Sequence, residues 1–114
     1  MSQTTALVFS IAVEAVVAFV LIRALGWGSG LNAALAASLG TLVTHSIAWV
    51  SITRLEEPLG YAWAVALVES GVVLAESIAY RLLVPLRWRR ALIASLIANG
   101  ASTAAGLLYY ALVL

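Results

Sequence analysis

Four long runs of apolar residues constrain this chain more than any other feature of its sequence. They extend over about residues 6–25, 31–52, 59–83 and 91–114. Because a helix rises about 1.5 Å per residue, each run is long enough to cross the roughly 30 Å hydrocarbon core of a bilayer. A helix also pairs its own backbone N–H and C=O groups, which lipid cannot do. The sequence therefore predicts an all-α fold, an integral membrane four-helix bundle that occupies residues 1–114 as a single transmembrane domain.

The composition excludes several classes of function. Charged residues make up 10% of the chain, hydrophobic residues 64%, and the formal net charge is +1. A nucleic-acid partner is not expected, because binding a phosphate backbone needs a basic stripe. The chain has no cysteine, which excludes thiolate and disulfide chemistry. The serines lie in Ala-rich runs without a nucleophile elbow or a triad, so we predict no catalytic residue and no enzyme activity.

The arginines predict an orientation in the membrane. Arg54 lies on one side of the predicted bundle. The other five lie on the opposite side and are Arg23, Arg81, Arg87, Arg89 and Arg90. Since basic loops stay in the cytoplasm, we expect the Arg-rich loops to be cytoplasmic and both termini to be outside. The expected location is a bacterial plasma membrane.

Polar side chains lie inside the predicted spans at similar depths. Counted from the outer boundary, Glu14 is about 12 Å deep, His45 about 9 Å, and Glu69 and Ser102 about 14 Å, with Asn99 nearby. A charge in a bilayer costs about 2.5–3.5 kcal/mol on insertion scales, so such groups are expected to face the bundle. Two interpretations follow. The layer is a site for a proton or a metal ion, with Glu14, His45 and Glu69 as ligands, or it is a polar network that holds the helices together.

One ion pair is predicted deeper in the bundle. The same count puts Glu76 and Arg23 both about 25 Å from the outer boundary. Opposite charges at equal depth favour an interhelical ion pair, with Arg81 as a competing partner for the carboxylate. We interpret this pair as structural.

The two halves of the chain resemble each other. Residues 34–39 match residues 91–96 at all but one position, and Val13-Glu14 aligns with Val68-Glu69. This pattern suggests two parallel helix-hairpin repeats related by an axis along the membrane normal. The alternative is chance, because runs of Ala and Leu recur in any chain of such composition.

Part of the sequence resembles the small multidrug resistance transporters. The shared features are the length, four spans, Glu14 within the first span and residues 60–63, Gly-Tyr-Ala-Trp, at the start of the third. The resemblance implies an antiparallel dimer with a shared proton- and cation-binding glutamate, a role that would belong to Glu14. The one-sided arginines, together with His45 and Glu69 inside the membrane, depart from that family's pattern.

A second pattern is similar to small bacterial four-helix membrane proteins of unassigned function. It covers the second to fourth spans and implies a fold without a chemistry. Its residues are Thr44, His45, Trp49, Glu69, Glu76, Tyr80, Arg81, Ala91, Leu92, Ser95, Leu96, Asn99, Ser102 and Gly106.

Three functional hypotheses remain open from the sequence. The first is an oligomeric transporter or channel for protons or cations that uses the Glu and His layer. The second is a non-catalytic accessory subunit of a larger membrane complex. The third is tetrapyrrole or metal binding through His45, since an intramembrane histidine suits such a ligand. No cofactor is predicted, and the expected partners are the lipid bilayer and either further copies of this chain or the other subunits of a complex.

Overall fold

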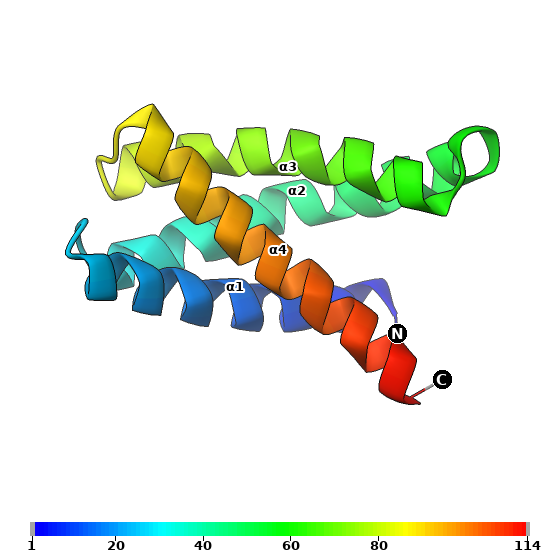
Figure 1. The fold of residues 1–114 in the computed structure, drawn as a ribbon, viewed down its shortest axis with the longest axis horizontal. Helices are drawn as coiled ribbons and strands as arrows, with labels where there is room; N and C mark the ends of the chain where they lie inside the picture. Colours follow the sequence, from blue (N-terminus) through cyan, green and yellow to red (C-terminus); the bar gives the residue numbers. More distant parts are fainter. Residues whose placement is uncertain (1, 114) are drawn as a thin grey trace.

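A computed structural model describes residues 2–113 and contains four α-helices with no strand in that range (Figure 1). The helices are α1 (Gln3–Leu25), α2 (Gly30–Leu59), α3 (Tyr61–Leu83) and α4 (Trp88–Val113). All four are long and apolar enough to cross a membrane. The prediction of an all-α membrane bundle is therefore confirmed.

The second helix is longer than the sequence predicted. We expected a loop at residues 53–58, where three charges precede Pro58, but α2 continues to Leu59. Arg, Leu and Glu are good helix formers, and the helix ends one residue after Pro58, which lacks the N–H of a helical hydrogen bond. The turn comes at Gly60, whose φ of 83° suits a residue without Cβ. As a result, α2 and α3 extend beyond the N-terminus of α1 (Figure 1).

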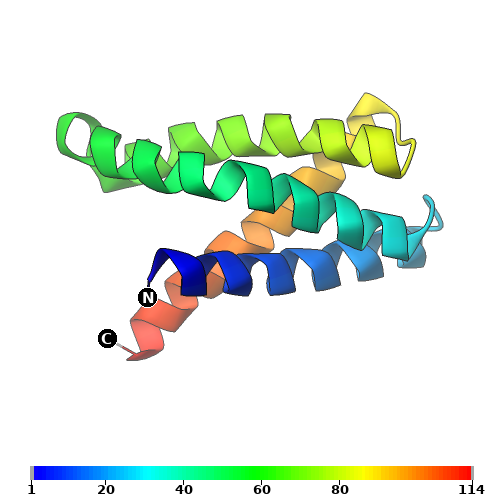
Figure 2. The same cartoon turned by 180° about the vertical axis from the view of Figure 1, so that it is seen from behind.

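The helices run up and down in sequence order. Each contacts the next along the chain, and α4 returns to pack on α1. The two ends of the bundle therefore differ. The α1–α2 and α3–α4 loops form one end, here called the Arg-rich end, and both chain termini and the α2–α3 turn lie at the other, here called the terminal end (Figure 2).

Helix α4 crosses the bundle obliquely. It begins beside the end of α3 and finishes close to the start of α1, as both ribbon views show (Figures 1 and 2). The distance between α3 and α4 therefore widens toward the terminal end. The internal repeat is not tested by this arrangement and stays a prediction.

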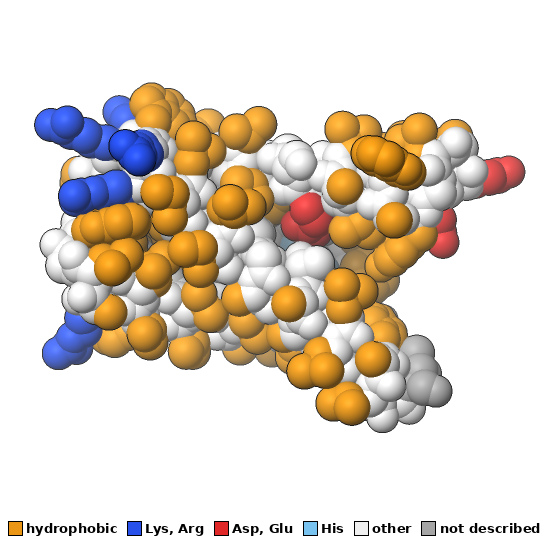
Figure 3. All heavy atoms as spheres, in the orientation of Figure 1, with side chains coloured by type: hydrophobic (Ala, Val, Ile, Leu, Met, Phe, Trp, Pro, Cys, Tyr) orange, Lys and Arg blue, Asp and Glu red, His pale blue; other side chains and the backbone are white. Residues whose placement is uncertain are grey.

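Small residues build the core near the Arg-rich end. Ala33, Ala36 and Ala37 of α2 and Ala91 and Ala94 of α4 are fully buried there. In a bilayer, helices gain little from hiding leucine from lipid, and small residues let their backbones approach closely. The large aliphatic side chains instead point outward over much of the surface (Figure 3).

A leucine in this alanine layer is expected to destabilise the bundle. Ala94→Leu forces three extra carbons into a fully packed site, which costs about 1–3 kcal/mol and should lower the midpoint of thermal unfolding in detergent. Ala104→Leu is the matched control, because Ala104 lies on the same helix and is exposed. Equal stability of the two variants would contradict the close packing described here.

Candidate functional site

A cleft of about 340 Å³ penetrates the bundle from the terminal end and is lined by all four helices. It lies where α4 diverges from α3, and a carboxyl group is visible in the hollow between them (Figure 3). Aromatic side chains, including Phe9, Trp49 and Tyr61, line its outer part. The polar residues Glu14, Thr41 and Glu76 line its inner part.

Two glutamates meet at the inner part of the cleft. Glu14 of α1 is 2% exposed and Glu76 of α3 is 1% exposed. The hydroxyl Oγ1 of Thr41 lies 2.9 Å from Oε1 of Glu14 and 3.2 Å from Oε1 of Glu76. The two carboxyl groups are also within hydrogen-bonding reach of each other. Three helices are thus joined through one small polar cluster.

Helix α2 is shaped to accept the Glu76 side chain. A Cβ at Gly40 would lie 2.9 Å from Cγ of Glu76, closer than real Cβ atoms approach. One turn further on, Thr44 Oγ1 lies 2.9 Å from the Gly40 carbonyl and 3.1 Å from Oε2 of Glu76. Gly40 therefore makes room for the Glu76 carboxyl group. Thr41 and Thr44 each place a hydroxyl next to one of its two oxygens.

Helix α4 covers the pair with amide and hydroxyl groups. Asn99 is 5% exposed, and its Nδ2 donates to the carbonyl of Ser95 at 2.8 Å. Ser95 in turn donates to the Val73 carbonyl at 2.8 Å, which fastens α4 to α3. Ser102 donates to the Asn99 carbonyl at 3.1 Å, and its hydroxyl also reaches the Glu14 carboxyl. Asn99 and Ser102, both predicted from the sequence to lie near the polar layer, line the cleft on its α4 side.

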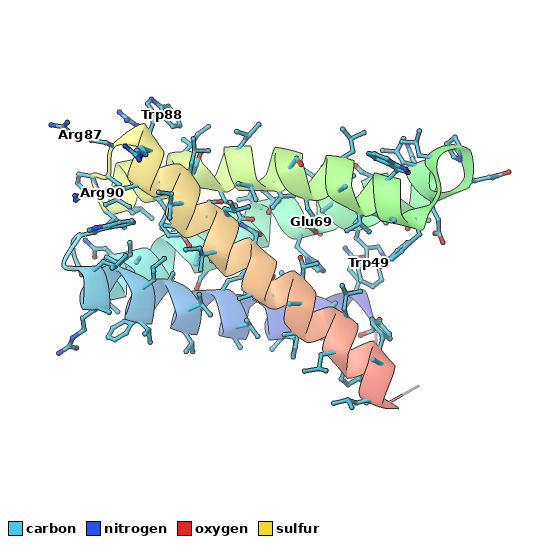
Figure 4. The ribbon with its side chains drawn as sticks, in the orientation of Figure 1. Trp49, Glu69, Arg87, Trp88 and Arg90 are labelled. Carbon is cyan, nitrogen blue, oxygen red and sulfur yellow. The ribbon has the colours of Figure 1, made fainter. Side chains whose placement is uncertain are left out.

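Glu69 and His45 line the same cleft closer to the terminal end. Glu69 is half-buried and lies on the α3 wall of the cleft, with Trp49 across from it (Figure 4). The His45 ring packs 5.8 Å from the Trp49 ring. Its Nε2 is buried and has no hydrogen-bond partner among residues 2–113. Glu69 precedes Glu76 by seven residues, which separates the two by about 10 Å along the helix.

The layer predicted from the sequence is therefore only partly assembled as expected. Glu14, His45 and Glu69 share one cleft, but the carboxyl that meets Glu14 is that of Glu76. Within the described part of the chain, no three side chains of the His, Cys, Asp or Glu type come together in a way that would hold a metal ion. The groups available to the Glu14–Glu76 pair are oxygens, which suit a proton or a hard cation.

The predicted ion pair between Glu76 and Arg23 is wrong. The Arg23 side chain is exposed, and its guanidinium lies 5.8 Å from the centre of the Phe19 ring, whereas Glu76 is buried against Glu14 and Thr41. The depth count assumed that all four helices start at one boundary. Because α2 and α3 extend further at the terminal end, Glu76 is closer to the level of Glu14 than to that of Arg23.

Cationic side chains lie at the ends of the bundle. In the part that the structure describes, Arg81 stacks on Trp88 at 4.5 Å and Arg90 on Trp27 at 5.0 Å, both at the Arg-rich end (Figures 3 and 4). Neither arginine lines the cleft. The two buried carboxyl groups are therefore surrounded by hydroxyls and amides rather than by positive charge.

Thr41 is a site residue that the sequence reasoning did not select. A signal was present, because Thr41, Thr44 and His45 follow the three- and four-residue spacing of a single helical face. That face is the one α2 turns toward the cleft.

The comparisons with known proteins found no relative. No protein-family model matches the chain, and no curated protein or solved structure matches it either. What this protein does is therefore inferred from the cleft itself.

A methyl group at residue 40 is expected to displace Glu76. Gly40→Ala should cost about 1–3 kcal/mol, as overpacking does, because its Cβ would collide with Cγ of Glu76. Gly71→Ala is the control: a Cβ there meets nothing within 4 Å, so the change should stabilise α3 by about 0.5–1 kcal/mol. Thermal unfolding in detergent measures both, and a harmless Gly40→Ala would contradict the close contact.

Proposed function

We propose that this protein is a small membrane transporter that moves protons or cations, with Glu14 and Glu76 as the binding groups. The observation that carries this proposal is the pair of buried carboxyl groups in a cleft that is open at one end. Ionisable groups inside a membrane are costly and are usually found on ion pathways or proton relays. Here they are reached from the terminal end without passing through packed core.

The shape of the cleft supports a transporter over an open channel. Beyond Glu76, toward the Arg-rich end, Ala37, Tyr80 and Ala18 are all fully buried. The cleft therefore ends within the bundle rather than crossing it. A site that is reached from one side at a time fits alternating access, in which helices rock around a fixed binding site.

The side opening of the cleft supports an oligomer. Glu69 lies on the wall between the diverging α3 and α4, which would face lipid in a monomer (Figure 4). A carboxyl group is costly there. Another copy of this chain, or another subunit, would cover it.

A second function is an accessory subunit whose polar cluster is purely structural. The contacts of Thr41 with Glu14 and Glu76 join α1, α2 and α3, which is the arrangement expected of an interhelical polar network. In that case, the outward-facing aromatic residues would contact partner chains.

The third hypothesis is tetrapyrrole binding through His45. The buried and unpartnered Nε2 of His45 would be the ligand atom, and an absorbance spectrum of the purified protein tests it.

Glutamine variants in proteoliposomes test the transport proposal. Glu14→Gln and Glu76→Gln should each reduce proton or cation flux about tenfold or more, which corresponds to at least about 1.4 kcal/mol, because glutamine has no exchangeable acidic proton. Glu57→Gln is the control, since Glu57 is exposed at the terminal end and does not line the cleft. Wild-type flux in all three variants would contradict the proposal. Absence of flux in the wild type, with lost stability or a lost partner in the buried variants, would favour the accessory subunit.

The proposed orientation places the Arg-rich end in the cytoplasm and the terminal end outside a bacterial plasma membrane. The chain has no cysteine, so single cysteines label cleanly. A membrane-impermeant maleimide applied to intact spheroplasts should modify Glu57→Cys and spare Arg89→Cys, both of which replace exposed residues. Arg89→Cys should react after the membrane is permeabilised. The opposite pattern would reverse the orientation.

A further inference from the structure

The Glu14–Glu76 cluster contains more short oxygen–oxygen contacts than its threonines have hydrogens to fill. Four oxygen–oxygen contacts of 2.9–3.2 Å connect the hydroxyls of Thr41 and Thr44 to Glu14, Glu76 and the Gly40 carbonyl. Each contact needs one hydrogen between its two oxygens. A threonine hydroxyl has one hydrogen to donate, and carboxylates and carbonyls have none. The two threonines therefore supply two of the four hydrogens.

The other two hydrogens must come from the two carboxyl groups. The Gly40 carbonyl can only accept, so the Thr44 hydroxyl donates to it, and the contact between Thr44 and Oε2 of Glu76 needs a proton on Glu76. Oε1 of Glu76 then accepts from Thr41. Because the Thr41 hydrogen is now used, its 2.9 Å contact with Glu14 needs a proton on Glu14. All four threonine contacts are hydrogen bonds when both carboxyl groups are protonated, and the direct contact between the two carboxyl groups then shares one of these two protons.

The charges around the pair agree with this count. Two carboxylates in contact would repel each other, and the groups that face them offer no compensating positive charge. Helix α4 presents Ser102 and Asn99, which do not titrate, and α2 presents the threonines, with His45 one turn away. On α3, the titratable neighbours are Glu69, which would add a further negative charge if ionised, and Tyr80.

Tyr80 provides an independent observation. It is fully buried, and its hydroxyl has no hydrogen-bond partner in the described residues. It lies one turn after Glu76, and helical side chains lean toward the N-terminus, so its ring is directed toward the pair. Both carboxyl groups are within electrostatic range of the hydroxyl. A buried donor left without an acceptor beside two acids is available to whichever of them becomes charged.

We infer that the Glu14–Glu76 pair is a two-proton site, with one proton on each carboxyl group in this state, and that the Tyr80 hydroxyl donates to the pair when a proton leaves. The departing proton passes to water in the cleft, and the carboxylate left behind accepts from Tyr80. This inference deepens the proposed transport function, because it makes the proton, rather than a metal cation, the ion bound at this site.

Infrared spectroscopy of the purified protein tests the inference without a transport assay. At neutral pH, the wild type should show a carbonyl band from protonated carboxyl groups that shifts in D₂O and is insensitive to added NaCl. Glu14→Gln and Glu76→Gln should each remove about half of the intensity that belongs to the pair. Glu69→Gln identifies any contribution from that residue, and Glu57→Gln, which replaces an exposed residue outside the cleft, should change nothing. Should a glutamine variant fail to fold, the D₂O shift of the wild-type band still reports the protons.

A pH titration of the same band tests the part played by Tyr80. Tyr80→Phe should keep the band and move its disappearance about one pH unit upward, because a hydrogen bond to a charged group is lost only in the ionised state. An unchanged midpoint would overturn the role of Tyr80. Absence of the band at neutral pH, or its loss on addition of Na⁺, would overturn the two-proton site.

The outcomes also separate this inference from the proposed function. If the band is present but no flux is measured, the two-proton site is supported and the transport proposal is wrong. If flux is measured but the band is absent, the transport proposal is supported and the two-proton site is wrong.

Discussion

Glu14 and Glu76 meet inside a bundle whose surface faces hydrocarbon, and this contact determines what the surrounding helices must supply. A carboxyl group in such a place needs hydrogen-bond partners from the protein, because lipid offers none. Helix α2 meets the need with Thr41 and Thr44, and with Gly40, which leaves room for the Glu76 side chain. Three residues within little more than one turn of α2 therefore accommodate carboxyl groups that come from α1 and α3.

The same contact divides the bundle into two unlike halves. Toward the Arg-rich end, fully buried alanines allow the helices to pack closely, and none of these alanines lines the cleft that holds the glutamates. Toward the terminal end, α4 leaves α3 and the cleft opens (Figure 1). The packed half holds the four helices together, so the open half can tolerate polar walls. The glutamate pair lies at the boundary between the two.

The sequence predicted the fold well because it depends on long apolar runs, which the bilayer itself imposes. It predicted the site less well because a site depends on the relative heights of helices. The charges and proline at residues 53–58 indicated a loop, whereas α2 continues to Leu59. That difference of about two turns moved Glu76 from the expected level of Arg23 to the neighbourhood of Glu14. Glu14, Glu69 and His45 were still found, since a costly residue inside a span is visible without any knowledge of packing.

The presence of glutamate rather than glutamine at residues 14 and 76 helps to decide whether the pair is structural or functional. If the cluster served only to join helices, glutamine at either position would offer an acceptor and two donors. It would do so without ever carrying a charge, which costs roughly 2.5–3.5 kcal/mol inside a membrane. A carboxyl group offers one thing that glutamine lacks, a proton that can leave and return. Two such groups in contact, with an unpartnered tyrosine hydroxyl beside them, form an arrangement in which that property is used.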